Sequence, residues 1–226
     1  MCAQRSEAVE LTADADGVRA FYHAEVAKHG YTHRGLGFNN RESQLHRFDV
    51  LRSVGDLHRA RVLDVGAGLG DFVRYLWARG VVPDYTGLEL CEHLVAEARR
   101  RHQGPGPARF LAGDILTADL SGPYDYVIAS GIFGLETPSA AGRIIPTLTR
   151  LYELCRRAVA VNFLSARASR KAPQRLYVEP LEALARALTL TPTVTLRHDY
   201  LPNDFTLFLY REPRWTELDS EHQGGQ

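Results

Sequence analysis

The sequence predicts an α/β protein, in which strands and helices alternate along the chain. Short apolar runs typical of buried strands alternate with longer amphipathic runs typical of helices, an order that favours parallel pairing. The run 62–65, for example, is followed by Phe72, Val73, Leu76 and Trp77 at helical spacing. Further strands are expected at 85–90, 108–116, 126–129, 158–164, 191–200 and 205–211, and further helices at 91–102, 144–157 and 181–188.

Composition indicates a single globular domain of ordinary polarity. The chain has 226 residues, 45% hydrophobic and 24% charged, which is enough for one real core. Lys plus Arg equal Asp plus Glu at 27 each, so the formal net charge is zero. Zero net charge argues against a protein whose affinity depends on phosphate-backbone contacts, so nucleic acid is not an expected partner. We expect a monomer or a homodimer.

Cysteine usage and hydropathy predict a cytoplasmic protein. The three cysteines, Cys2, Cys91 and Cys155, are odd in number and widely spaced. They suit neither a disulfide framework nor a metal site, so no metal is expected. The first ten residues mix charges without an apolar core, and no apolar run approaches the roughly 20 residues that a membrane span requires. We therefore expect neither a signal peptide nor a membrane partner.

About sixty residues precede the first expected strand. Residues 1–15 are expected to be a frayed start, and 17–28 carries apolar residues at helical spacing. The segment 31–40 is turn-rich and holds aromatic, histidine and amide side chains, and another helix is expected at 42–57. Because binding groups are often carried on loops over a rigid scaffold, 31–40 is a candidate for ligand contacts.

The chain is organised around a glycine-rich turn that follows the strand 62–65. Gly66, Gly68 and Gly70 stand at alternate positions ahead of a helix. This geometry lets the backbone approach a ligand closely and directs N–H groups at it. A dinucleotide fingerprint would place its third glycine one residue later. Asp64, two residues before the first glycine, also suits a cationic amino-acid moiety better than a pyrophosphate.

The stretch 61–72 resembles the first motif of the class I S-adenosylmethionine (SAM)-dependent methyltransferases, an acidic residue followed by x-G-x-G-x-G. A bare strand–turn–helix corner is the alternative for such a glycine cluster taken alone. The resemblance extends in motif order over roughly residues 60–211, and its terminal signatures are similar to small bacterial methyltransferases of types 11, 12 and 25. Those signatures are Ser43-Gln44 with Arg47-Phe48, and His198-Asp199-Tyr200 with Phe205-Thr206.

The resemblance implies a Rossmann-like fold whose seven-stranded sheet is mostly parallel, with an antiparallel last strand and helices on both faces. It implies that residues 1–58 form a helical cap over the active site, that 59–211 form the SAM-binding domain, and that 212–226 are a flexible tail. SAM is the implied cofactor, and S-adenosylhomocysteine (SAH) is the implied product.

Acidic residues end the second and third expected strands. Glu89 lies about twenty residues beyond the last glycine, where nucleotide sites carry a ribose-binding carboxylate; a solvated glutamate is the alternative. By the resemblance, Asp114 accepts from the adenine amine and Ile115 lies beside the ring, with an ordinary Asx turn as the alternative. Arg47 is a candidate for the methionine carboxylate. The expected cofactor residues are Arg47, Asp64, Gly66, Ala67, Gly68, Gly70, Glu89, Leu90, Asp114, Ile115, Ser130 and Gly131.

The segments after the fourth and fifth strands are expected to line the transfer chamber, because ligands lie beyond the carboxyl ends of strands at a switch point. The run 129–133 lacks the Asp/Asn-Pro-Pro-aromatic pattern of many nucleobase amino methyltransferases, which argues against a base-amine target. The basic loop 165–174, with Arg175 after it, is either solvated or a wall for an anionic acceptor. The expected substrate-binding residues are Tyr31, Asn39, Phe133 and Asn162.

Methyl transfer is an in-line displacement that removes a positive charge, so positioning and desolvation can supply most of the acceleration. A base is needed only if the acceptor must lose a proton, and His198 and His33 are the candidates by residue type. The predicted function is methyl transfer to a small metabolite or natural product. The alternatives are an RNA or protein methyltransferase, a SAM-binding protein without transfer activity, and a nicotinamide oxidoreductase, against which the early third glycine argues.

Overall fold

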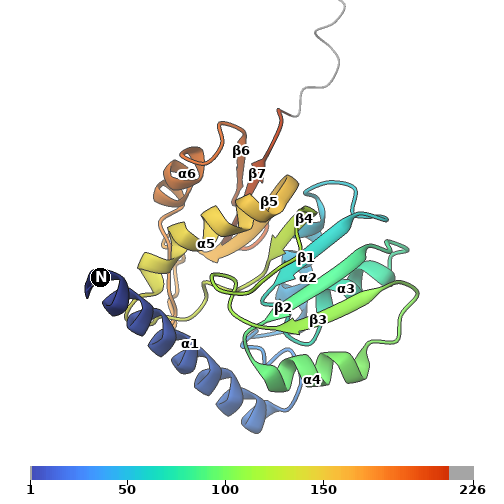
Figure 1. The fold of residues 1–226 in the computed structure, drawn as a ribbon, viewed down its shortest axis with the longest axis horizontal. Coiled ribbons are helices and arrows are strands. Elements are labelled where there is room, and N and C mark those ends of the chain that lie inside the picture. Colours follow the sequence, from blue (N-terminus) through green and yellow to red (C-terminus); the bar gives the residue numbers. More distant parts are fainter. Residues whose placement is uncertain (1, 214–226) are drawn as a thin grey trace, which may run out of the picture.

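The computed structural model describes residues 2–213, with side chains described from residue 14 onward. The tail expected at 212–226 therefore lies outside the described residues, apart from its first two positions. Within the described part, a seven-stranded sheet forms the middle of the molecule and helices flank it (Figure 1).

The sheet confirms the topology expected from the sequence. Its strands are β1 (Arg61–Val65), β2 (Asp84–Glu89), β3 (Ala108–Ala112), β4 (Tyr124–Ala129), β5 (Cys155–Leu164), β6 (Val194–Arg197) and β7 (Asp204–Tyr210). They lie side by side in the order β3-β2-β1-β4-β5-β7-β6. Strands from β3 to β5 pair in parallel, and β7 runs antiparallel between β5 and β6. The chain order reverses between β1 and β4, which makes this the switch point of the sheet.

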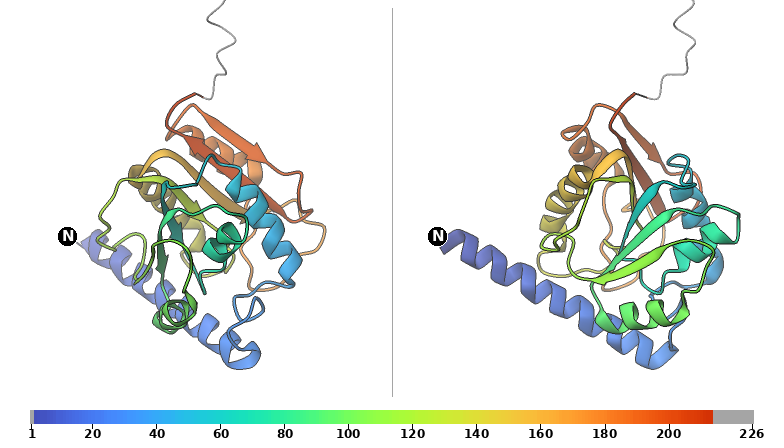
Figure 2. Two further views of the ribbon diagram at one scale, coloured as in Figure 1. Left: turned by 90° about the vertical axis from the view of Figure 1, so that its right-hand side faces the viewer. Right: turned by 45° about the vertical axis from the view of Figure 1, so that its right-hand side comes forward.

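Helices cover both faces of the sheet, as predicted. They are α1 (Cys2–His29), α2 (Arg41–Arg52), α3 (Asp71–Trp77), α4 (Glu92–Arg101), α5 (Ala140–Leu154) and α6 (Pro180–Leu188). Apolar side chains of α2, α3 and α4 pack on one face with Val62, Tyr85 and Phe110, and those of α5 and α6 pack on the other with Leu63 and Val65. Two turned views show these layers (Figure 2).

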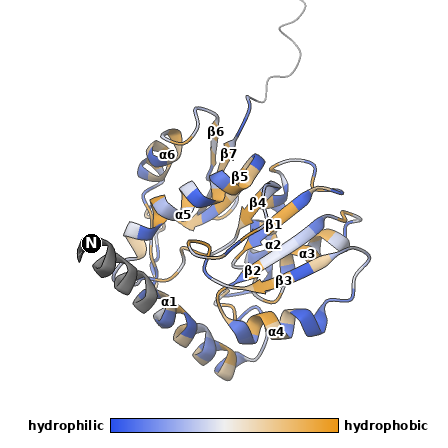
Figure 3. Cartoon of the chain, in the orientation of Figure 1, coloured by the Kyte–Doolittle hydropathy of each residue, from blue (hydrophilic) through white to orange (hydrophobic). Residues whose placement is uncertain are grey.

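The division into two cores follows from the strand pattern. Neighbouring residues of a strand point to opposite faces of a sheet, so Val62 and Leu63 enter different cores. Hydrophobic residues accordingly concentrate on the central strands, and hydrophilic residues on the outer sides of the helices (Figure 3). Because apolar side chains cover both faces of the sheet, the polar side chains that can bind a ligand are those at the strand ends.

The first helix differs most from the sequence prediction. α1 begins at Cys2, whereas residues 1–15 were expected to be frayed. Its 28 residues include one glycine and no proline, so no strong helix breaker separates the two parts. α1 runs along the edge of the sheet where the parallel strands end (Figures 1 and 2). Smaller differences occur elsewhere: α2 ends at Arg52 rather than near 57, and β3 ends at Ala112 rather than near 116.

Candidate active site

A cavity of about 430 Å³ lies beyond the carboxyl ends of the strands, on both sides of the switch point. α1, the segment 36–44 and the segment 172–177 contribute walls opposite the strand ends. Ligand sites of open α/β sheets occur at this position, and cavities of this size hold small molecules. Most of the predicted cofactor residues meet here: Arg47, Asp64, Gly66, Ala67, Gly68, Glu89, Leu90, Asp114, Ile115, Ser130 and Gly131.

The glycine turn is held against β2 and the segment after β4. Gly66 has a φ of 73°, which favours glycine, and a Cβ there would lie 2.5 Å from Cγ2 of Ile132. The Gly66 N–H donates to the carbonyl oxygen of Leu88 at 2.8 Å, and the Gly68 N–H donates to the Glu89 carboxylate at 2.8 Å. These N–H groups therefore fix the cavity floor, whereas the motif suggested that they would be free for a ligand.

Gly70 differs from its predicted role, because it is not among the residues that line the cavity. It precedes α3 as the N-cap with a φ of 70°. A Cβ at this position would lie 2.2 Å from Nε2 of His102 and 2.8 Å from the ring of Phe110. The third glycine is thus required by close packing at the start of α3, a requirement that a glycine motif cannot distinguish from ligand contact.

Glu89 ends β2 at the cavity floor and is only 7% exposed. Its two carboxylate oxygens accept from the Gly68 N–H at 2.8 Å and from the Cys91 N–H at 2.9 Å. Burial raises the pKa of Glu89, and these backbone donors partly offset the shift. A carboxylate oxygen has more than one acceptor site, so Glu89 can accept further hydrogen bonds from a ligand.

Asp64 lies near the end of β1, beneath the glycine turn, and is 2% exposed. The Tyr85 hydroxyl donates a hydrogen bond to its Oδ2. Burial raises the pKa of Asp64 to about 7, while the Tyr85 hydrogen bond acts in the opposite direction. Because a buried carboxylate ionises more readily beside a positive charge, Asp64 suits a cationic group in the cavity.

Asp114 forms the Asx turn that was the alternative to a binding role, and it also lines the cavity. The Leu116 N–H donates to its Oδ1 at 2.9 Å. Nη2 of Arg143, on α5, donates to its Oδ2 at 2.6 Å. These contacts orient the carboxylate at the cavity wall beside Ile115, which is buried.

Arg47 lines the cavity but pairs with a carboxylate that the sequence did not predict. Its Nε and Nη2 donate to the two carboxylate oxygens of Asp204, whose side chain is fully buried at the start of β7. Nη1 of Arg47 has no hydrogen-bond partner among the described residues. On the same helix, Gln44 donates to Asp71 at 3.2 Å, directly after the glycine turn. Both side chains line the cavity, but only Gln44 contacts a residue next to the glycine turn.

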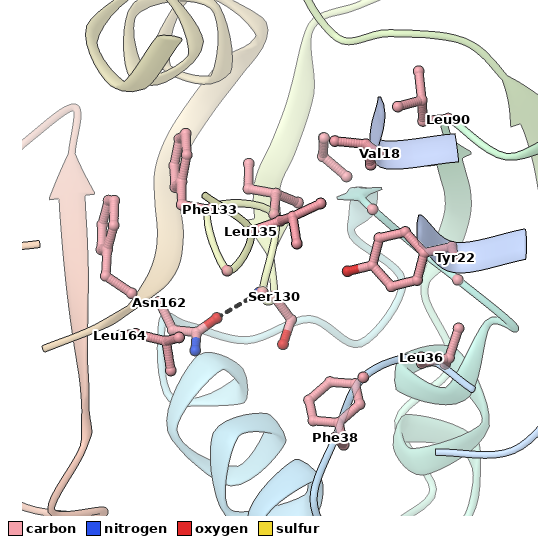
Figure 4. Close-up of a pocket in the computed structure, with 18 of the residues that line it drawn as sticks. Val18, Tyr22, Leu36, Phe38, Leu90, Ser130, Phe133, Leu135, Asn162 and Leu164 are labelled. Carbon is pink, nitrogen blue, oxygen red and sulfur yellow. Dashed lines mark hydrogen bonds between the residues drawn. The ribbon is translucent and has the colours of Figure 1, made fainter. Parts of the chain in front are cut away.

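Asn162 and the segment after β4 form the inner wall of the cavity (Figure 4). The Gly131 N–H donates to Oδ1 of Asn162 at 2.8 Å, which fixes the amide and leaves its Nδ2 available. Within residues 14–213, the buried Oγ of Ser130 has no hydrogen-bond partner. Phe133 stacks on Phe163 with their ring centroids 5.0 Å apart. The inner wall thus combines an aromatic surface with two available polar groups.

α1 faces the cavity with Asp14, Val18 and Tyr22, which are spaced four residues apart. Figure 4 shows Val18 and Tyr22 at the cavity. Oδ2 of Asp14 accepts from Oγ1 of Thr137 at 2.7 Å and from the Ser139 N–H at 3.2 Å. These bonds attach α1 to the start of α5. Burial raises the pKa of Tyr22 to about 12, so its hydroxyl stays neutral near pH 7. The four-residue spacing of these residues could have predicted this face from the sequence. It was missed because residues 1–15, which include Asp14, were expected to be frayed.

Besides Gly70, three predicted site residues lie outside the cavity. Tyr31 packs beside α4, where its carbonyl oxygen accepts from Nη2 of Arg101 at 3.0 Å. His33 lies in the turn after α1, and the exposed His198 stands edge-on to Phe205 at 6.1 Å between ring centroids. The structure therefore does not support Tyr31 as a substrate contact, nor either histidine as a base. Asn39, Phe133 and Asn162 do line the cavity.

Cys91 and Cys155 are buried free thiols. Among the residues with described side chains, no group of three or more His, Cys, Asp and Glu residues is placed to hold a metal ion. In the described part of the chain, every helix is too short or too polar to cross a membrane.

Residues 62–157 match a family described as a methyltransferase domain. Over 166 residues the chain is 31% identical to "Putative methyltransferase Rv1506c" of Mycobacterium tuberculosis, an alignment that covers 70% of this chain and 98% of that relative. The chain belongs to the class I SAM-dependent methyltransferases. As a member of this family, the enzyme uses SAM as its cofactor.

The fold of this methyltransferase is similar to that of solved methyltransferases. Magnesium protoporphyrin IX methyltransferase of Synechocystis PCC 6803, with bound SAH, has a TM-score of 0.63 at 17% identity, covering 86% of this chain and 98% of that one. The CcbJ methyltransferase of Streptomyces caelestis has a TM-score of 0.58 at 18% identity, covering 74% and 88% respectively. At these identities the likeness shows a common fold.

Proposed function

We propose that this methyltransferase transfers the methyl group of SAM to a small metabolite or natural product held in the cavity. The observation that carries the proposal is the enclosure of the cavity by α1 and by the segments 36–44 and 172–177. These segments narrow the approach of a polymer to the strand ends, whereas a small molecule fits among them. The zero net charge is consistent with this choice, since an RNA substrate favours a basic surface.

In this proposal the ends of β1, β2 and β3 hold the cofactor. Glu89 accepts from the ribose hydroxyls, and Asp114 accepts from the adenine amine. Asp64 faces the methionine ammonium, and the remaining Nη1 of Arg47 is available to the methionine carboxylate. The other predicted cofactor residues that line the cavity shape its walls: Gly66, Ala67, Gly68, Leu90, Ile115, Ser130 and Gly131.

The acceptor is placed in the half of the cavity beside β4 and β5. SAM supplies an electrophilic methyl group on its sulfonium. Oγ of Ser130 and Nδ2 of Asn162 orient the acceptor, because they are the polar groups of the inner wall that lack partners among the described residues. The aromatic ring of Phe133 and the side chains of α1 exclude water there.

The proposed transfer uses positioning rather than a histidine base. No histidine is among the described residues that line the cavity. Tyr22 is also unsuitable as a base, because burial raises its pKa to about 12 and keeps the hydroxyl protonated. The chain therefore binds and orients the acceptor, and the acceptor proton leaves to water.

The test is a transfer assay with SAM that carries a labelled methyl group, run on separate fractions of a cell extract: dialysable small molecules, RNA and protein. The expected result is label in the dialysable fraction, absent with Glu89→Ala and retained with Glu92→Ala, a substitution at an exposed position on α4. Label in RNA or protein would overturn the small-molecule acceptor. SAH binding without label in any fraction would instead favour a SAM-binding protein without transfer activity.

A further inference from the structure

The acceptor half of the cavity contains a cation without an anionic partner. Three arginines line the cavity: Arg47, Arg143 and Arg175. Arg47 pairs with Asp204 and Arg143 pairs with Asp114. Arg175 makes no ion pair with any described residue. A half-buried cation without a counter-ion carries a desolvation cost that an anionic ligand would offset.

The contacts of Arg175 hold its guanidinium in place without neutralising it. Nη2 donates to the carbonyl oxygen of Gly37 at 3.3 Å. The guanidinium lies over the ring of Phe21, 5.3 Å from the ring centroid. A carbonyl and an aromatic face occupy only part of a group with five N–H donors, so a bidentate site for a carboxylate remains.

The backbone before Arg175 also directs it into the cavity. Gln174 has a φ of 61°, which is uncommon for a residue with a side chain. Its carbonyl oxygen accepts from the Glu136 N–H at 3.0 Å, which attaches this loop to the segment after β4. A Cβ at Gly134 would lie 3.9 Å from Nη1 of Arg175. The guanidinium is thereby kept beside the segment that the proposed function assigns to the acceptor.

The position of Arg175 favours the acceptor over the cofactor as the source of the anion. Arg175 comes after β5 in the chain. Glu89 and Asp114, which are assigned to the nucleoside, lie on the other side of the switch point, where Glu89 ends β2 and Asp114 follows β3. The methionine carboxylate already has a candidate partner in Nη1 of Arg47. The anion expected at Arg175 therefore belongs to a second molecule.

The charges and the apolar side chains that line the cavity indicate the chemical class of that second molecule. One guanidinium without an ion pair can bind one carboxylate. The cavity is unfavourable for a dianion such as a phosphate monoester, because it is also lined by five carboxylates: Asp14, Asp64, Asp71, Glu89 and Asp114. The residues that follow Gly37 and Gly134 are Phe38 and Leu135, and both line the cavity. Figure 4 shows the two side chains entering it from different segments. The remaining body of the ligand is thus apolar or aromatic.

We propose that Arg175 binds the carboxylate of the methyl acceptor, so that the acceptor is an apolar or aromatic molecule with a single carboxylate. This inference rests on the proposed small-molecule function and adds a recognition group to it. The carboxylate serves as the handle, and a different atom of the acceptor receives the methyl group near Ser130 and Asn162.

The experiment titrates benzoate and its neutral isostere benzamide into SAH-loaded protein and follows binding by calorimetry. Wild type is expected to bind benzoate saturably and more tightly than benzamide. Arg175→Ala is expected to weaken benzoate binding by about tenfold or more, with partial recovery in Arg175→Lys. The matched control is Arg170→Ala, because Arg170 is an exposed arginine of the same loop that does not line the cavity. SAH affinity is measured for each variant.

The outcomes separate the sources of the anion. Equal benzoate affinity in Arg175→Ala and Arg170→Ala, or no saturable benzoate binding to SAH-loaded wild type, would overturn the inference. A loss of SAH affinity in Arg175→Ala as large as the loss of benzoate affinity would also overturn it, because Arg175 would then serve the cofactor carboxylate. Failure of the proposed function looks different: wild type does not bind SAH, or the label enters RNA or protein.

Discussion

At the scale of single residues, Glu89 and Asp64 are both buried carboxylates, yet their partners differ. Glu89 accepts two backbone N–H groups, whereas Asp64 accepts one tyrosine hydroxyl. Burial raises the pKa of both groups. Two backbone donors orient the Glu89 carboxylate, which suits it to accept from neutral hydroxyl groups. Asp64 has one hydrogen-bond donor, so a positive charge would stabilise its ionised form more. The same residue class at neighbouring strand ends is therefore suited to different parts of one cofactor.

Replacing Glu89 tests the cofactor assignment. Glu89→Ala is expected to weaken SAH binding by about tenfold or more, because the ribose hydroxyls lose a charged acceptor. Calorimetric titration measures the change, and Glu92→Ala is the control at an exposed position on the next helix. Glu89→Gln retains an oxygen that can accept from the Gly68 N–H, so it serves as the test variant if Glu89→Ala does not fold. SAH affinity in Glu89→Ala within twofold of wild type would contradict the assignment.

The pKa of Asp64 predicts how stability depends on pH. The value in the folded state, about 7, lies above that of an unfolded aspartate. The unfolded state therefore ionises first, and the free energy of unfolding falls as pH rises from about 4 to about 7. Asp64→Asn should remove this fall, which is on the order of 4 kcal/mol. Urea unfolding of ligand-free protein at a series of pH values measures it.

Saturating SAH should also reduce that fall, because an ammonium beside Asp64 stabilises the ionised carboxylate. A pH dependence of stability that Asp64→Asn leaves unchanged would show that other groups cause it.

At the scale of elements, α1 is held to the rest of the molecule at the start of α5. Ser139, the N-cap of α5, makes no side-chain cap bond of its own. Asp14 supplies the acceptor for its N–H from another helix, and Asp14 is only 5% exposed. One carboxylate thus satisfies an unpaired helix-start donor and fixes the position of α1 over the cavity.

Removing this contact should loosen α1 over the cavity. Asp14→Ala is expected to speed SAH dissociation several-fold and to increase cleavage by trypsin after Arg19, with little loss of global stability. Stopped-flow dissociation and limited proteolysis measure these effects. Asp16→Ala is the matched control, since Asp16 lies on the same helix with an exposed side chain whose one ion pair among residues 14–213 is with Arg19. Equal effects of the two substitutions would show that the Asp14 contact does not hold α1.

At the scale of the whole molecule, cofactor binding and folding are linked, because the cavity forms only when distant segments meet. Residues from α1 to the β6–β7 turn line it. A ligand that binds only the folded state stabilises the whole domain by mass action.

SAH at about 100 times its dissociation constant should therefore raise stability by about 2.7 kcal/mol and the melting temperature by about 5–10 °C. Differential scanning calorimetry measures the shift. Gly68→Arg should abolish it, because Gly68 has a φ of 53° and a Cβ there would lie 3.2 Å from Leu36. A shift of equal size in Gly68→Arg would place SAH elsewhere.

Local patterns in the sequence were sufficient to predict the sheet, its helices and most of the strand-end residues that line the cavity. These patterns depend on residues that lie close together in the chain, so they can be recognised in the sequence alone. They are the strand alternation, the helical spacing, the glycine turn and the acidic strand ends. The same locality explains the errors: Gly70 belongs to the motif but packs against His102, which lies 32 positions further along.

Only the tertiary structure decided which charged groups are already paired and which remain for a ligand. Arg47 meets Asp204 across 157 positions, and Asp14 meets Ser139 across 125. No periodic pattern in the sequence predicts such pairs, because long-range contacts depend on how the helices and strands pack together. Arg175 is recognisable as the unpaired arginine of the cavity wall among the described residues only when all three cavity arginines are seen together. The sequence by itself thus determined the cofactor and the fold, and the packing of distant segments determined which charged groups of the cavity are paired with one another.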